Sequence, residues 1–184
     1  MHQVVIGTWE LRIDIGALPV AYDWYVGNTR LAEEIDLKSK DGQVLFVAAF
    51  AWDDPTRDYW KPVLTCAQTY SPSQAGFDPG FLIVPETARL FVGAGTRILA
   101  YDLSAPARLW EDKTDCGFWH WGRHRGYVWM AAELEFAVWS ATGTKLWSTF
   151  VEPPWDATML GEDVLLDIMG RKERRRLSNG EIVS

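Results

Sequence analysis

Short runs of apolar, aromatic and β-branched residues, separated by Gly, Pro, Asn and Asp, dominate the second half of the chain. Such runs predict β-strands, and the short breaks between them predict tight turns. Residues 81–84, 89–94 and 97–103 predict a three-strand meander. Further strands are predicted at residues 127–132, 135–139, 145–151 and 164–169. Residues 31–40 show only weak helical periodicity, so we expect a loop or a strand there.

The strand-rich region also repeats. Ala100 to Trp110 aligns with Ala137 to Trp147 at an offset of about 37 residues, and both segments run from Ala to Trp over the same spacing. One further step of the same size takes Gly143 to Gly180. This period is typical of stacked β-units such as propeller blades. Residues 51–80 are rich in turn signals and do not fit the repeat.

The repeated residues carry a family resemblance. Ala100, Asp102 and Trp110 in one unit, and Ala137, Trp147 and the intervening Thr142–Gly143 in the next, form a pattern that resembles the blade motif of quinoprotein (pyrroloquinoline-quinone-type) β-propellers. The resemblance covers residues 81–184. Two positions depart from the motif, since Pro106 replaces its Gly in the first unit and Trp139 replaces its Asp in the second. Cofactor-binding members close about eight blades around a channel. At about 40 residues per blade, this chain holds four at most, and we expect no quinone cofactor.

These patterns predict an all-β fold of stacked, propeller-like antiparallel β-meanders, a small or partial β-propeller, with a two-sheet β-sandwich as the alternative. A chain of 184 residues is within the usual range for one domain. We therefore expect a single all-β domain over residues 1–184. Residues 1–80 would form a divergent β-region, and residues 81–184 would hold the repeated units.

Net charge and composition limit the classes of partner that this protein is expected to bind. The net charge of −7 disfavours nucleic acid, which is bound by basic surfaces. The basic run at residues 171–176 predicts either a solvated strand or turn, or a local patch for an acidic partner. No apolar run reaches the roughly 18 residues that span a bilayer, and residues 1–10 do not resemble a signal peptide. We expect a cytoplasmic protein that does not bind membranes, with Cys66 and Cys116 reduced and partly buried.

The sequence contains few of the residue patterns that are typical of catalytic or metal-binding sites. On a strand, Cys116, His120 and His124 would lie about 13 Å apart from one to the next, too far to share a zinc ion. No Gly-x-Ser-x-Gly motif is present, and the remaining histidine is His2. The chain has 25 acidic residues, so close carboxylate pairs will occur by chance. We therefore expect no metal, and catalysis is less favoured than binding.

Eleven tryptophans are more than the repeat positions explain. Trp52, Trp60 and Trp155 stand beside proline and acidic residues, which makes them harder to bury in a core. Trp is also enriched among the residues that dominate protein interfaces. The residues we expect at a partner- or ligand-binding surface are therefore Trp52, Asp53, Asp54, Trp60, Trp155 and Asp156.

Two hypotheses for function follow. The first is a non-catalytic binding protein with a protein partner, for example an acidic immunity-type inhibitor that covers a basic toxin surface. The alternative is a protein that binds or hydrolyses a carbohydrate or small molecule in a Trp-lined groove. The sequence leaves the oligomeric state open.

Overall fold

The computed structural model describes residues 1–39, 41–52, 60–72 and 77–183. These residues form four sheets, called A to D here, which follow one another along the chain. Sheet A contains β1 (His2–Ile6), β2 (Trp9–Ile15), β3 (Leu31–Ile35), β4 (Gln43–Ala51) and β5 (Leu64–Tyr70). Sheet B contains β6 (Gly80–Val84), β7 (Arg89–Ala94), β8 (Arg97–Asp102) and β9 (Ala107–Lys113).

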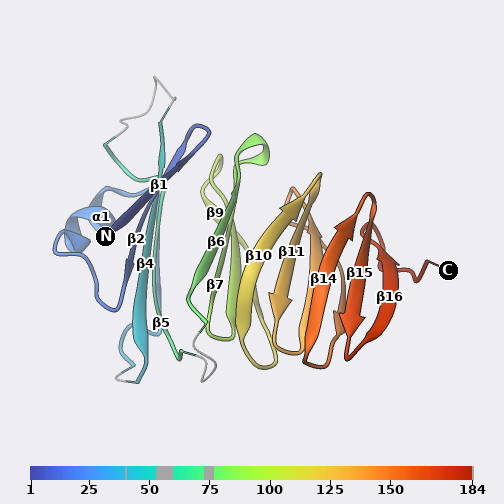
Figure 1. Cartoon of the computed structure of the whole chain (residues 1–184). Helices are drawn as coiled ribbons and strands as arrows, with labels where there is room; N and C mark the ends of the chain where they lie inside the picture. The colour runs from blue at the N-terminus through green and yellow to red at the C-terminus, as the bar shows by residue number, and fades with distance from the viewer. Residues whose placement is uncertain (40, 53–59, 73–76, 184) are drawn as a thin grey trace.

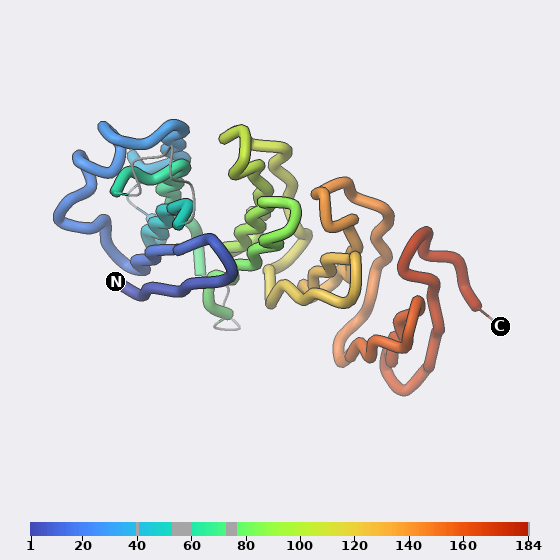
Figure 2. The backbone as a smooth tube through the Cα atoms, turned by 90° about the horizontal axis from the view of Figure 1, so that it is seen from above, coloured from blue at the N-terminus to red at the C-terminus, as the bar shows by residue number. Residues whose placement is uncertain are grey.

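Sheet C contains β10 (Phe118–His124), β11 (Tyr127–Ala132), β12 (Glu135–Ser140) and β13 (Lys145–Phe150). Sheet D contains β14 (Trp155–Leu160), β15 (Asp163–Ile168) and β16 (Arg171–Arg176). An antiparallel bridge between Arg175 and Ile182 adds the start of a fourth strand to sheet D. The four sheets stand in a row with the two chain termini at opposite ends (Figure 1). Seen from above, the row curves (Figure 2).

Sheets B, C and D are antiparallel meanders in chain order, as the repeat predicted. The fold is all-β and its row of sheets is propeller-like, whereas the alternative of a two-sheet sandwich does not describe it. Sheet A is different, because its strand order is β1-β2-β4-β5-β3 and β3 runs parallel to β5. Residues 31–39 are not helical, as expected: they form β3 followed by a turn. A short helix, α1 (Tyr22–Asn28), was not predicted.

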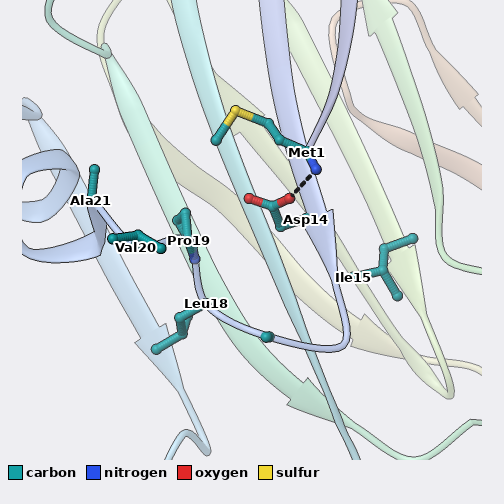
Figure 3. Close-up of a pocket in the computed structure, with 8 residues that line it drawn as sticks. Met1, Asp14, Ile15, Leu18, Pro19, Val20 and Ala21 are labelled. Atoms are coloured by element: carbon teal, nitrogen blue, oxygen red, sulfur yellow. Dashed lines mark ion pairs between the residues drawn. The ribbon is translucent and has the colours of Figure 1, made fainter.

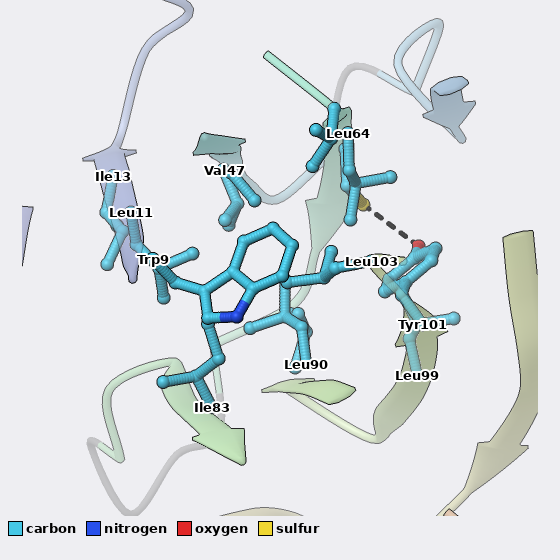
Figure 4. Packing of buried hydrophobic residues seen from close by; sticks show 14 of the residues in the cluster. Trp9, Leu11, Ile13, Val47, Leu64, Ile83, Leu90, Leu99, Tyr101 and Leu103 are labelled. Atoms are coloured by element: carbon cyan, nitrogen blue, oxygen red, sulfur yellow. Dashed lines mark hydrogen bonds between the residues drawn. The ribbon is translucent and has the colours of Figure 1, made fainter. Parts of the chain in front are cut away.

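Apolar side chains fill each space between neighbouring sheets. Between sheets A and B, Trp9 of β2 lies among Leu11, Val47, Leu90 and Leu103 (Figure 4). A second cluster joins sheets B and C, and a third joins sheets C and D. Each sheet therefore buries its apolar faces against its neighbours, as stacked repeats require.

One tryptophan joins sheet B to sheet C, and a second joins sheet C to sheet D. The indole N–H of Trp110 on β9 donates to the carbonyl of Gly143, in the β12–β13 turn, at 2.6 Å. One repeat later, Trp147 on β13 donates to the carbonyl of Leu177 at 2.8 Å and packs against Gly180. The predicted equivalence of Gly143 and Gly180 is confirmed, because both residues lie in the turn that receives the preceding sheet's Trp.

At one end of the row of sheets a helix covers sheet A, and at the other end sheet D presents polar side chains to solvent. Helix α1 places Tyr25 against Phe46 and Phe50 on the outer face of sheet A. On sheet D, side-chain alternation along the strands puts Asp163, Lys172 and Arg174 on the outer face. Arg174 bonds Asp163 there at 2.7 Å. No helix among the described residues is long and apolar enough to cross a membrane.

Candidate functional site

Trp52 and Trp60 lie at the end of sheet A where β4 stops and the chain returns towards β5. Their side chains are 59% and 66% exposed. The backbone N–H of Trp52 donates to the carbonyl of Thr8 at 2.7 Å, so the pairing of β2 with β4 continues by one residue. This bond fixes the backbone of Trp52 beside the β1–β2 turn. Asp53 and Asp54, which the sequence also predicted here, lie outside the described residues.

Ile6 adds a third exposed apolar side chain at this end of sheet A. It pairs with Trp9, the residue that in turn pairs with Ala51, and it is 40% exposed. We call Ile6, Trp52 and Trp60 the tryptophan rim. Isolated exposed apolar residues are ordinary, but two large exposed indoles at the same end of a sheet as an exposed Ile are typical of interaction sites.

Trp155 and Asp156 lie elsewhere, on β14 of sheet D. Trp155 is half-buried: its ring stacks on Trp119 with centroids 5.2 Å apart, and its indole N–H donates to the carbonyl of Glu133 at 3.1 Å. Asp156 is exposed, and its carboxylate accepts from the backbone N–H of Ala157 at 2.8 Å. Sheets A and D are at opposite ends of the row, so the structure does not bring these two residues to the tryptophan rim (Figure 1).

A row of aromatic rings runs from Phe77 through Trp119 to Trp155. Trp119 stacks on Trp155 with ring centroids 5.2 Å apart, and the ring of Phe77 is tilted against Trp119 with its centroid also 5.2 Å away. A sugar that stacks on an aromatic side chain needs a free ring face. Trp119 is partly buried and has one face covered by Trp155, so this row does not favour the Trp-lined carbohydrate groove.

An open depression of about 460 Å³ lies at the other end of β2 (Figure 3). Its wall is mainly apolar, with Ile15, Leu18 and Val20 exposed, and the terminal ammonium of Met1 pairs with Asp14 at 2.7 Å. Sequence reasoning missed this depression. The apolar run at residues 17–21, between a strand and a helix, was the signal that could have found it.

The one buried thiol is part of the contact between sheets A and B. The hydroxyl of Tyr101 donates to Glu33 at 2.7 Å, and the thiol of Cys66 lies 3.3 Å from the same hydroxyl (Figure 4). Burial raises the pKa of Cys66 to about 12, although a hydrogen bond donated by the Tyr101 hydroxyl to the sulfur acts in the opposite direction. The thiol therefore stays protonated at neutral pH and is a poor nucleophile. Cys116 is also free, but it is exposed rather than partly buried as expected.

The predicted strand through the histidines is β10. His120 is exposed, and His124 Nε2 lies 2.8 Å from the carbonyl of Gly161. Partial burial lowers the pKa of His120, and the nearby carboxylate of Asp156 acts in the opposite direction. Among the described residues, no three His, Cys, Asp or Glu side chains come together as a metal site. The absence of a metal stays a prediction.

The chain was compared with known proteins. No family model and no curated protein matches it. Among solved structures, the computationally designed Ika4 protein is 14% identical over 62% of this chain and 76% of its own, with a TM-score of 0.45. BamB from Moraxella catarrhalis is 15% identical over 79% of this chain, with a TM-score of 0.45. A europium-containing methanol dehydrogenase is 16% identical over 57% of this chain, with a TM-score of 0.41. The match spans 45% of that BamB chain and 23% of that dehydrogenase chain.

Proposed function

We propose that this chain is a non-catalytic binding protein that recognises a protein partner through the tryptophan rim, Ile6, Trp52 and Trp60. The observation that carries the proposal is the exposure of Trp52 and Trp60, at 59% and 66%. Burying a large indole at an interface removes much apolar surface from water, and Trp residues often dominate binding energy. In the described part of sheets B to D, by contrast, each Trp is at least partly buried.

The charge of the chain supports a basic partner. At −7, its field attracts a positively charged protein and accelerates the encounter, most strongly at low salt. An immunity-type inhibitor that covers a basic toxin surface is the specific case that we propose. Its binding needs no reactive group, and the protonated Cys66 supplies none.

Copurification is the first test. The tagged chain is isolated from its native host as wild type, as the W52A/W60A double variant, and as a W24A control. Trp24 is 44% exposed on α1, which covers the outer face of sheet A, so the control removes an exposed indole that is not part of the rim. We expect a basic protein to copurify with the wild type and with W24A but not with W52A/W60A.

Calorimetry with the identified partner then measures how much each rim Trp contributes to the binding free energy. Each rim Trp→Ala change should weaken binding by about 2 kcal/mol or more, and the association rate should fall as salt rises. Equal binding by wild type and W52A/W60A would remove the rim from the interface. Isolation without any partner, together with a positive glycan array, would favour the carbohydrate alternative instead.

A further inference from the structure

Strand β1 is an open edge of sheet A. Within the described part of the chain it pairs only with β2, and all five of its residues, His2 to Ile6, are exposed. Val4, Val5 and Ile6 are 41%, 55% and 40% exposed. In Figure 2 the β1–β2 hairpin lies at the margin of sheet A, and its turn, where Gly7 lies beside Pro85, faces sheet B. The free side of β1 is therefore accessible to another strand.

This edge lacks the usual protection. Proteins block sheet edges with charged side chains, prolines or bulges, because unpaired backbone groups invite another strand. Residues 2–6 contain no Lys, Arg, Asp, Glu or Pro, and the pairing of β1 with β2 has no register shift. The terminal ammonium beside the strand is paired with Asp14.

The other edge strands in the described part of the chain are charged or packed. The opposite edge of sheet A, β3, carries Glu33 and Glu34, and β16 at the C-terminal end has five basic residues among six. Strand β6 is uncharged, but none of its residues is exposed, and it packs beside β10. Only β1 combines full exposure with neutrality.

The hairpin geometry identifies the backbone groups that face outward. Ile6 pairs with Trp9 across a two-residue turn in which Gly7 has φ +60°. The residues that flank such a turn bond each other, and bonded pairs then alternate along the hairpin. Ile6, Val4 and His2 therefore direct their backbone groups to β2. Gln3 and Val5 direct theirs outward, which leaves two N–H donors and two C=O acceptors on the open edge.

We propose that β1 is a self-association edge, which pairs antiparallel with β1 of a second copy of this chain about a two-fold axis at Val4. In this register Gln3 of one copy faces Val5 of the other, and the two pairs make four backbone hydrogen bonds. The two Val4 side chains face each other directly and cover one another. Sheet A then continues from one copy into the next as one antiparallel sheet.

The absence of charge on β1 favours a second copy of this chain as its pairing partner. Two-fold pairing places each residue opposite its own copy or a near neighbour, so a charged edge would bring like charges together. The neutral β1 avoids this cost although the whole chain is acidic. The two His2 residues lie opposite Ile6, at separate ends of the pair. A five-residue strand pair is smaller than a standard stable interface, so we expect a weak, concentration-dependent dimer.

Sedimentation equilibrium and light scattering from micromolar to millimolar protein test the proposal. The wild type should shift from monomer to dimer as concentration rises. V5P removes an outward N–H but leaves the β2 ladder intact, because proline is tolerated on an edge where its nitrogen faces solvent. We expect V5P to raise the dimer dissociation constant at least about tenfold, which equals about 1.4 kcal/mol. V5T keeps the N–H and the β-branched shape, and should dimerise like the wild type.

A charge experiment fixes the register. V4K places two ammonium groups across the axis and should abolish the dimer, whereas Q3E/V5K places Glu opposite Lys in both pairs and should strengthen it. Circular dichroism and thermal melts confirm that each variant remains folded. A wild type that stays monomeric at millimolar concentration overturns the proposal. A dimer that V5P and V4K leave unchanged shows that copies associate through another surface, and it overturns the proposal equally.

Discussion

Tryptophans occur in both the N-terminal sheet A and the repeated sheets B to D, but they are placed differently. Trp110 and Trp147 each donate an indole hydrogen bond to the turn of the next sheet. In sheet A and its flanking segments, Trp9 is buried, whereas Trp24, Trp52 and Trp60 are exposed. In the repeat, Trp joins sheets within the molecule. Around sheet A, three of the four Trp side chains are exposed at the surface of the molecule.

The contact between sheets A and B shows how far sheet A departs from the repeat. Its edge strand β3 offers Glu33 to sheet B, where Glu33 accepts from Tyr101 at 2.7 Å and lies 3.6 Å from Arg108. A polar group thus occupies the contact that a Trp makes between later sheets. The β8–β9 turn of sheet B carries Pro106 where the later turns have Gly143 and Gly180.

The largest expected effect separates the two uses of Trp. Trp139 is 1% exposed, stacks on Trp110 and packs edge-to-face on Trp121. Truncation to Ala should therefore cost about 3–5 kcal/mol of unfolding free energy. Urea denaturation of W139A beside the wild type measures it. A loss below about 1 kcal/mol, within the range of surface changes, would mean that sheets B and C are not packed as described.

A matched glycine pair tests the repeat contact itself. Gly180 has φ +74°, and a Cβ there would lie 2.8 Å from the Trp147 ring. Gly161 has φ +63°, and a Cβ there would meet nothing within 4 Å. We expect G180A to cost about 2–3 kcal/mol from backbone strain and steric overlap. G161A should cost about 1–2 kcal/mol from strain alone. Thermal melts give the difference, and equal losses would show that Trp147 does not dock on this turn.

Asp102, a residue of the repeat motif, links stability to pH. Burial opposes its ionisation, but hydrogen bonds from Ser104 and Ala105 and the charge of Arg89 outweigh burial and lower its pKa below the ordinary 3.8. Its stabilising contribution is therefore present above pH 3.8 and is lost as the pH falls through the lower folded value. D102N should lose about 1 kcal/mol at pH 7, because a charged acceptor is stronger than a neutral one. Denaturation should show a smaller difference in unfolding free energy between wild type and D102N near pH 2 than at pH 7. A difference that grows in acid would contradict a contribution from the ionised Asp102.

Sequence could predict the repeated half because local signals and the fold agree there. Strands β6 to β8 begin and end within one residue of the predicted runs, since Gly, Pro and turn residues separate them. The Ala-to-Trp spacing also aligned Trp110 with Trp147, and in the structure each donates to the turn of the next sheet because the units pack in the same way.

Sheet A could not be predicted in the same way, because long-range pairing determines it. Residues 41–46 resemble the start of the outer strand β13, yet β4 lies in the middle of sheet A between β2 and β5. Helix α1 has no side-chain cap, and the packing of Tyr25 on Phe46 and Phe50 holds it in place. Trp155 looks like a loop residue beside Pro154, but in the structure it stacks on Trp119 at the contact of sheets C and D. Among the described residues of the predicted site, only Trp52 and Trp60 share one end of one sheet.

The smallest expected effect is at that end of sheet A, and it completes the contrast with W139A. Trp52 and Trp60 keep 59% and 66% of their surface in the free protein, so truncation removes little buried area. The backbone bond from Trp52 to Thr8 does not depend on the indole and should survive in W52A. Thermal melts of W52A and W60A should therefore stay within about 0.5 kcal/mol of wild type, with W52A the better tolerated. W155A is the control, because its stacked ring should make truncation clearly more costly. Equal unfolding of all three variants would mean that sheet A uses its tryptophans as the repeats do, and the partner surface would then have to lie elsewhere.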